Sequence, residues 1–149
     1  MTTPLLMVQL KNFHSTEANC QCGCGKPTKP ELMLRLQALL LILEDFYGCP
    51  VRCHITGGAR CNKHQLEVYG GKRVESYHCG PQRGRRPDPE GWAVDVVVEI
   101  NPRGDWAKIS KDRLDQHAIE SKLFGGVGWK IYGPSTGFVH LDLGPVRTF

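Results

Sequence analysis

Three polar residues, His78, Asp95 and His140, have metal-binding side chains and interrupt segments that otherwise read as strand or tight turn. Segment 93–100 is rich in β-branched residues that alternate as in a strand, and segment 138–143 repeats the pattern. Because side chains on a strand point alternately to opposite faces, we expect Asp95 and His140 on the faces turned away from the apolar residues. Two imidazoles and one carboxylate suit zinc with one coordination position left for water, which is typical of catalytic sites.

His78 differs from the other two because it lies in a polar, turn-rich segment. Gly70-Gly71 and Ser76 precede it, so we expect His78 to approach from a loop. An isolated His or Asp on a strand is more often a surface or hydrogen-bonded residue than a ligand. Convergence of the three side chains is therefore a hypothesis that the tertiary structure has to test.

The elements that must position these residues predict an α+β fold. Thr28-x-x-Glu31 reads as a capping box, Pro30 suits the first turn, and Gly48 ends the helix after Tyr47. Its apolar stripe is expected in the core and comprises Leu32, Leu36, Leu39, Leu40 and Leu43. The other expected elements are a strand (51–55), a short helix (62–69), a helix capped by Ser110 (110–123) and a hairpin (127–132 with 138–143). Helices flanking a small, mainly antiparallel sheet make up this fold class.

The length of 149 residues suits one domain, and no linker or repeat divides residues 1–149. The apolar stretch 32–43 is too short for a membrane span and is interrupted by Arg35 and Gln37. No basic region precedes an apolar stretch at the N-terminus, so we expect synthesis in the cytosol without a signal peptide. We also expect a monomer.

Charge gives a weaker signal. Nineteen Lys and Arg against fifteen Asp and Glu give a net charge of +4, which modestly favours anionic partners such as cell-wall polymers or nucleic acid. Part of this charge is concentrated in Arg83-Gly84-Arg85-Arg86, within the turn-rich segment 81–90. This segment is expected to be a surface loop that is either solvated or in contact with substrate.

The seven cysteines are an odd number, and a cytosolic origin argues against a disulfide scaffold. Cys20-x-Cys22-x-Cys24 is spaced more tightly than the ligand pairs of zinc ribbons. A fourth ligand for a structural metal would have to be Cys49, Cys53, Cys61 or Cys79. We expect free thiols rather than a second, structural metal site.

Five motifs follow one another along the chain: Thr56-Gly57-Gly58-Ala59-Arg60-Cys61, Gly70-Gly71, Ser76-x-His78, Gly91-x-Ala93-x-Asp95 and Phe138-Val139-His140-Leu141-Asp142. Their order resembles the M15 family of zinc D-Ala-D-Ala peptidases, which are peptidoglycan carboxypeptidases and endopeptidases and include bacteriophage endolysins. The opening Asn12-Phe13 with the cysteine motif resembles the compact, single-domain branch of this family. The ending, residues 139–147, is similar to the murein endopeptidases of the same superfamily.

The resemblance implies a hedgehog/D-Ala-D-Ala peptidase-like fold and one catalytic zinc ion bound by His78, Asp95 and His140. It also implies that Arg60 and Ser76 lie near the substrate, a peptidoglycan stem peptide. A guanidinium can grip a carboxylate with two parallel hydrogen bonds, which suits such a peptide, and a hydroxyl can donate one more. The alternative for Arg60 is a structural salt bridge.

The chain departs from the family pattern at two places. Seventeen positions separate His78 from Asp95, more than is usual in the family, so segment 81–90 reads as a loop inserted between two ligands. Gly137 stands where several members carry Glu or His, three residues before the last ligand. The base must then come from elsewhere, and Asp142, on the same side of its strand as His140, is the candidate. Asp142 can instead orient an imidazole, or be purely structural.

These features predict a zinc-dependent peptidoglycan peptidase that reaches the cell wall by a route such as phage-assisted release. Gly137 is the main support for the alternative, a catalytically reduced cell-wall-binding or phage morphogenesis protein of the same fold. Nucleic-acid binding through the cysteines and the Arg-rich segment rests on charge and thiols alone, so no specific nucleic acid is expected.

Overall fold

The structure is a computed structural model, and it describes residues 10–72, 74–81, 83 and 88–149. It is an α+β fold with one mixed sheet, as the sequence predicts. The helices are α1 (Pro30–Tyr47), α2 (Asn62–Val68) and α3 (Lys111–Ser121). The strands are β1 (Val51–Gly57), β2 (Ala93–Ile100), β3 (Ala107–Lys108), β4 (Gly126–Gly128), β5 (Val139–Asp142) and β6 (Arg147–Thr148). Short 3-10 turns are η2 (Ser15–Ala18), η3 (Tyr77–Cys79) and η4 (Lys130–Tyr132).

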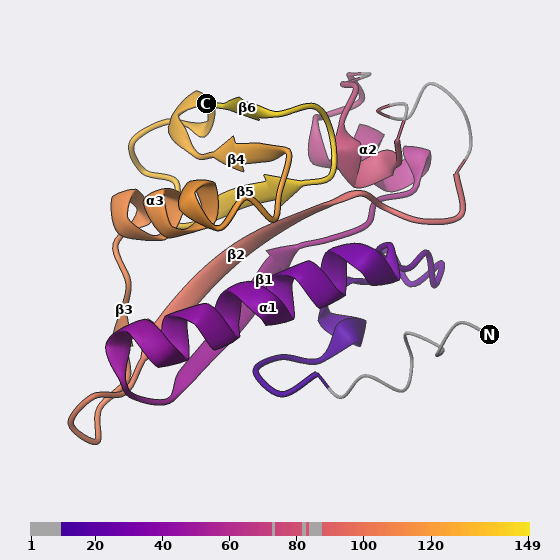
Figure 1. Ribbon diagram of the computed structural model, residues 1–149. Helices are drawn as coiled ribbons and strands as arrows, with labels where there is room; N and C mark the ends of the chain where they lie inside the picture. The colour runs from indigo at the N-terminus through magenta and orange to yellow at the C-terminus, as the bar shows by residue number, and fades with distance from the viewer. Residues whose placement is uncertain (1–9, 73, 82, 84–87) are drawn as a thin grey trace.

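The sheet order is β1-β2-β5-β4-β6, with β3 also paired to β2. Pairings are antiparallel except β4 with β6, which is parallel. Helices α1 and α3 contact each other, α1 also contacts β1, and α3 contacts β4 and β5 (Figure 1). The two helices therefore lie over the face of the sheet that carries its apolar side chains.

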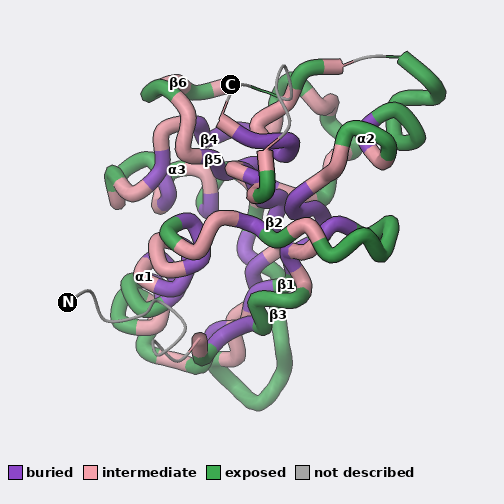
Figure 2. Tube along the Cα trace, turned by 90° about the vertical axis from the view of Figure 1, so that its right-hand side faces the viewer, coloured by how far each residue is buried: buried purple, intermediate pink, exposed green. Residues whose placement is uncertain are grey.

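The core lies between α1 and this sheet face. All five leucines of the predicted stripe are fully buried. They belong to the same apolar cluster as Val94, Val96 and Val98 of β2 and as Val139 and Leu141 of β5. The strands at the centre of the molecule are largely buried, whereas α2 and the turn after β2 are mostly exposed (Figure 2). Alternation along β2 and β5 leaves the polar residues of both strands on the opposite face.

Helix α1 confirms the predicted bounds, including Pro30 in its first turn and Gly48 in the left-handed conformation (φ 63°) that ends it. The predicted capping box is wrong. The Thr28 hydroxyl donates to the carbonyl of Ala18 at 2.7 Å, and Glu31 pairs with Arg35 at 2.9 Å. Because other contacts occupy both side chains, Thr28 links the N-terminal segment to α1 instead of capping it.

The predicted strand 127–132 is also wrong in extent. Strand β4 ends at Gly128, and η4 follows it. A Cβ atom at Gly128 would lie 1.8 Å from the backbone oxygen of Phe149, so the end of the chain passes directly against β4. The backbone amides of Trp129 and Lys130 both donate to that same oxygen, which draws the chain out of the ladder. Among the described residues, no helix has the length and apolar character needed to cross a membrane.

Candidate metal centre

His78, Asp95 and His140 converge at one buried point. Their ligand atoms all lie within 4.8 Å of one another, and each residue is at most 4% exposed. Asp95 and His140 are direct partners in the register of β2 and β5, on the face of the sheet opposite the leucine core. His78 comes from η3, after a loop, as expected. The tertiary structure thus brings the three predicted ligands together.

Each imidazole makes one hydrogen bond on the side away from Asp95, and this bond defines its tautomer. The Nδ1 atom of His78 lies 2.7 Å from the carbonyl oxygen of Gly58, and a carbonyl can only accept, so Nδ1 carries the proton. The Nε2 atom of His140 lies 2.7 Å from Oδ2 of Asp142, so this nitrogen donates to the carboxylate. In the neutral rings, the lone pairs are then on Nε2 of His78 and Nδ1 of His140.

Both of these lone pairs face the same carboxylate oxygen. Oδ1 of Asp95 lies 3.3 Å from Nε2 of His78 and 3.0 Å from Nδ1 of His140. Three acceptors at such separations repel one another unless a cation lies between them, and that cation is either a proton on one ring or a metal ion. Imidazole nitrogens and a carboxylate oxygen are donors that zinc takes, so the residues fit a divalent metal of this type.

The electrostatics follow from burial and from these contacts. Burial alone raises the pKa of Asp95, but the neighbouring imidazoles outweigh it and hold that pKa well below the usual range. Burial alone lowers the pKa of His140, but its bonds to Asp142 and Asp95 raise that pKa above the ordinary value. The centre therefore favours a charged carboxylate and attracts positive charge.

Asp142 lies behind His140, on the side remote from Asp95. It is completely buried and accepts hydrogen bonds from His140, from the Arg147 guanidinium (2.6 and 3.0 Å) and from the backbone amides of Gly126 and Gly144. A carboxylate so fully engaged is suited to orienting an imidazole. The arrangement does not favour the prediction that Asp142 is the catalytic base, because both of its oxygens are already occupied.

Arg60 and Ser76, the predicted substrate-binding residues, both lie beside the centre. The Nη2 atom of Arg60 is 3.8 Å from Oδ2 of Asp95, and its Nη1 donates to Gln65 at 3.1 Å. Ser76 begins η3, and its hydroxyl oxygen accepts the backbone amide of His78 at 3.2 Å. Arg60 therefore has the structural ion pair that the sequence left open as the alternative.

A pocket of about 350 Å³ adjoins the centre and includes His140 in its wall. Ser76 and Tyr132 also line it, and Glu75 is the one acidic side chain among its lining residues. The Tyr132 ring packs against His140, with centroids 5.9 Å apart. Burial, followed by the charge of Asp95, raises the pKa of Tyr132 and keeps its phenol protonated. Sequence reasoning does not find Tyr132 or Glu75, because no periodic pattern marks a residue of a turn or loop.

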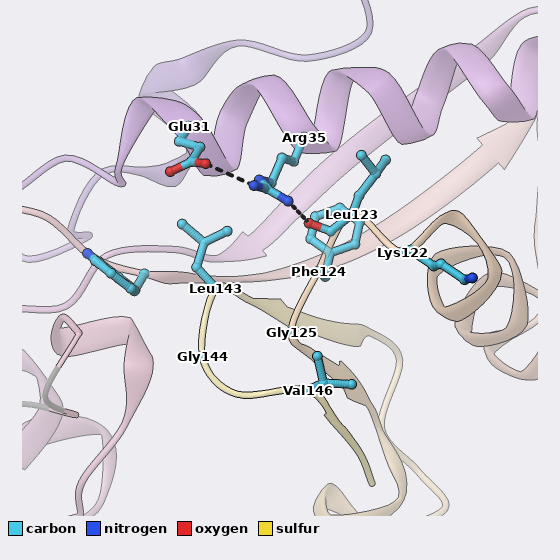
Figure 3. A pocket seen from close by; sticks show the side chains of 10 residues that line it. Glu31, Arg35, Lys122, Leu123, Phe124, Gly125, Leu143, Gly144 and Val146 are labelled. Carbon is cyan, nitrogen blue, oxygen red and sulfur yellow. Dashed lines mark hydrogen bonds and ion pairs between the residues drawn. The ribbon is translucent and has the colours of Figure 1, made fainter.

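A second pocket, of about 370 Å³, lies elsewhere, between α1 and the segments that follow α3 and β5 (Figure 3). Two of its charged groups pair with each other: Arg35 bonds to Glu31 at 2.9 Å, and it also bonds to the carbonyl of Leu123 at 2.7 Å. It has no His or Cys in its wall. This pocket therefore lacks the donors that make the first one chemically distinctive.

Two other charged features can be placed: Glu99 on β2, and Arg83 of the Arg-rich segment, which lines the pocket beside the centre. Glu99, on the Asp95 face of β2, is bound by Arg52 and His54 at 2.9 and 2.7 Å. In segment 81–90, which contains the Arg-rich cluster, residues 82 and 84–87 lie outside the described residues. Within the described part, Arg83 is placed over the Tyr77 ring, 5.6 Å from its centroid.

The structure also gathers four of the seven cysteines, Cys20, Cys22, Cys24 and Cys61, whose sulfur atoms lie within 4.8 Å of one another. The remaining cysteines are Cys49, Cys53 and Cys79, and all seven are free thiols. The fourth member of the cluster comes from the turn that follows β1 and directly adjoins Arg60.

No protein-family model matches this chain, and comparisons with the curated proteins and with the solved structures return no match. Functional reasoning therefore rests on the geometry of the His78, Asp95 and His140 centre and on the sequence motifs around it.

Proposed function

We propose that this chain is a zinc-dependent peptidase that hydrolyses amide bonds in the D-amino-acid-containing peptide stem or cross-link of peptidoglycan. One observation carries the proposal: the acceptor atoms of His78, Asp95 and His140 converge at a buried point beside a pocket of about 350 Å³. Three protein ligands with access to a pocket match the open coordination of catalytic zinc sites. The order of the sequence motifs supplies the substrate class.

In this proposal His78, Asp95 and His140 hold the metal. A zinc ion held by these residues would supply Lewis acidity and an activated water for amide hydrolysis. The protein orients both imidazoles in advance, since Gly58 accepts from His78 and Asp142 accepts from His140. Arg147 in turn holds Asp142, so rotation of His140 would break its bond to a carboxylate that is fixed in place.

Arg60 and Ser76 orient the peptide. The 3.8 Å separation of the Arg60 Nη2 atom from Asp95 is longer than a hydrogen bond, so this ion pair uses no N–H donor of Nη2. Nη2 is then suited to a carboxylate of the peptide stem. Ser76 accepts the amide of His78 through its oxygen, and its hydroxyl proton can still be donated to the substrate.

Glu75 is the candidate base in place of Asp142. It is exposed and lines the same pocket as His140. A base that takes a proton from water must reach the side on which the substrate binds. Glu75→Gln should therefore lower turnover about a hundredfold, the low end for a positioned base, with the zinc content unchanged.

The proposal is tested by measuring zinc content together with muropeptide release from purified peptidoglycan, identified by mass spectrometry. The wild-type chain should release muropeptides, and His140→Ala should lose both the metal of this centre and the activity. His54→Ala is the matched control, because His54 lies half-exposed on β1 and bonds to Glu99. Metal-loaded wild-type protein that binds peptidoglycan but releases nothing would replace the proposal with a wall-binding protein, the function that Gly137 favours.

A further inference from the structure

The second group of metal-type side chains is the cysteine cluster, which shares no residue with the proposed peptidase centre. The sulfur of Cys22 lies 3.4 Å from that of Cys20 and 3.5 Å from that of Cys61, and Cys20 and Cys61 are 3.9 Å apart. A disulfide brings two sulfurs to about 2.05 Å, far closer than any of these pairs. Four sulfurs bound at about 2.3 Å to one zinc ion lie about 3.8 Å apart, which matches the cluster.

The backbone around the cluster is shaped as a chelating loop. The amide of Cys20 donates to the carbonyl of Lys26 at 2.8 Å and closes residues 20–26 into one turn. Gly23 (φ 85°) and Gly25 (φ 81°) adopt the left-handed conformation that lets the chain reverse between alternate cysteines. The tight spacing of this motif, which argued against a metal site in the sequence, is thus accommodated by its glycines.

Backbone amides also point at the sulfur atoms. The amide of Cys61 donates to the sulfur of Cys20, and the amide of His64 donates to the sulfur of Cys61, both at 3.4 Å. Such N–H donors favour a thiolate over a thiol and are the partners that metal-bound ligands use. The sequence left Cys61 as one of four candidates for the fourth ligand, because nothing in a local pattern connects it to a motif 37 residues earlier.

The cluster is built into the support of the peptidase centre. The amide of Ala59 donates to the carbonyl of Ala18, and the amide of Arg60 donates to the carbonyl of His78, both at 2.8 Å. A Cβ atom at Gly58 would lie 2.2 Å from the backbone oxygen of Ala18, so residues 57–61 lie directly against the N-terminal segment. Cys61 follows Arg60 directly, and its sulfur contacts with Cys20 and Cys22 join the same two segments.

We propose that Cys20, Cys22, Cys24 and Cys61 bind one zinc ion as a closed, structural tetrathiolate site, separate from the His78, Asp95 and His140 centre. Soft thiolates select zinc, and four protein ligands leave no coordination position for a substrate. Binding releases the thiol protons to solvent as each sulfur becomes a ligand. The ion clamps the turn that carries Gly58 and Arg60, and so positions His78 and the guanidinium beside Asp95.

Zinc content measured by elemental analysis tests the proposal, because the two sites should contribute separately. The wild-type chain should hold two zinc ions, and Cys22→Ser with Cys24→Ser should leave one. These two cysteines are exposed, so their replacement opens no cavity. His78→Ala with His140→Ala should also leave one, and Cys49→Ser, the matched control outside the cluster, should leave two. If only the His78, Asp95 and His140 centre binds no zinc, the wild-type chain should hold one zinc ion, and only the cysteine variant should lose it.

Cobalt substitution of the unmodified chain provides a readout that needs no variant. Cobalt bound by four thiolates gives intense charge-transfer absorption in the near ultraviolet, which the His78, Asp95 and His140 centre cannot produce. This absorption should be present in the wild-type chain and in the histidine variant. The proposal would be overturned if this absorption were absent or if the cluster held iron in place of zinc. It would also be overturned if intact masses of freshly purified protein showed a disulfide within the cluster.

Discussion

At the scale of single residues, His140 is defined by what it touches on each side. Nδ1 faces Asp95, and Nε2 bonds to Asp142, which Arg147 and two backbone amides hold in place. Burial raises the pKa of Asp142, but its bonds to His140 and Arg147 outweigh burial and hold the pKa well below the usual range. The charged carboxylate therefore selects one tautomer of the imidazole.

The substitution Asp142→Asn tests this role. Because an amide cannot hold the imidazole tautomer as a carboxylate does, we expect the zinc affinity of the His78, Asp95 and His140 centre to fall about tenfold or more. Competition with a chromophoric chelator measures it. Glu99→Gln is the control, since Glu99 lies on the same sheet but pairs with Arg52 and His54. Unchanged affinity with turnover lowered about a hundredfold would restore Asp142 as the base.

Arg60→Lys should impair turnover far more than folding. An ammonium cannot make the forked contact that a guanidinium makes with a carboxylate, although it retains the charge beside Asp95. Muropeptide release and thermal melting are measured on the same preparation. Arg52→Lys is the control, because Arg52 also pairs with an acidic residue but lies on β1, away from the centre. Wild-type release by Arg60→Lys would leave Arg60 with a structural role only.

At the scale of elements, the close approach of β4 to β5 supports the centre. A Cβ atom at Gly126 would lie 2.5 Å from both carboxylate oxygens of Asp142 and from Nη1 of Arg147. No real Cβ atom tolerates such contacts, so a side chain at this position must displace the ion pair. The absence of a side chain at Gly126 is thus a condition for the orientation of His140.

Gly126→Ala should consequently lower both the thermal stability and the zinc affinity. Gly137→Ala is the matched control, because its Cβ atom would meet only the flexible end of Lys108, at 3.5 Å. Melting temperature and chelator competition are measured for both. If Gly126→Ala and Gly137→Ala have equal melting temperatures and zinc affinities, the Asp142 and Arg147 pair tolerates displacement.

Helix α1 anchors the N-terminal segment through Glu44, which receives bonds from Lys11 and Asn12 at 2.6 Å each. These bonds lower the pKa of Glu44 from its ordinary value. A lowered pKa in the folded state stabilises the protein above the unfolded pKa, and this contribution is lost as the pH falls through the folded pKa. The contribution of this contact to the free energy of unfolding therefore decreases as the pH falls.

Glu44→Gln should lower the free energy of unfolding by on the order of 1 kcal/mol at neutral pH. The difference from wild type should shrink as the pH falls below about 4.3, where an unperturbed glutamate is half protonated. Urea unfolding at several pH values measures it, with the exposed Glu120→Gln as control. A difference that does not change with pH would exclude this ionic contribution.

At the scale of the whole molecule, the two faces of the sheet have different tasks. One face packs against α1 and α3 in an apolar core, and the other carries Asp95 and His140. Apolar burial stabilises the first face without any metal, whereas three converging acceptors on the second need a cation. Removal of metal should accordingly weaken the site without dissolving the helical layer.

Exhaustive chelation should lower the melting temperature but leave the far-ultraviolet helical signal at 25 °C near that of the untreated protein. Circular dichroism before and after chelation, and after zinc is restored, measures both quantities. Loss of the helical signal on chelation would show that metal binding and folding of the leucine core are one cooperative event, as in small zinc-dependent domains.

The sequence by itself determined what depends on neighbouring residues. Alternation along 93–100 and 138–143 predicted two strands and the faces of Asp95 and His140, because side-chain direction in a strand is local. The leucine stripe predicted the buried side of α1 for the same reason, through helical periodicity. The turn-rich segment around His78 predicted its approach from a loop, without showing that the three residues meet.

Only the tertiary structure decided what depends on register and on contacts between distant segments. The pairing of Asp95 with His140, the approach of His78 and the position of Asp142 behind the imidazole follow from how β2, β5 and η3 are placed. The arrival of Cys61 at the N-terminal cysteines is of the same kind. No local pattern encodes such meetings, because residues far apart along the chain are brought together by packing of the whole sheet.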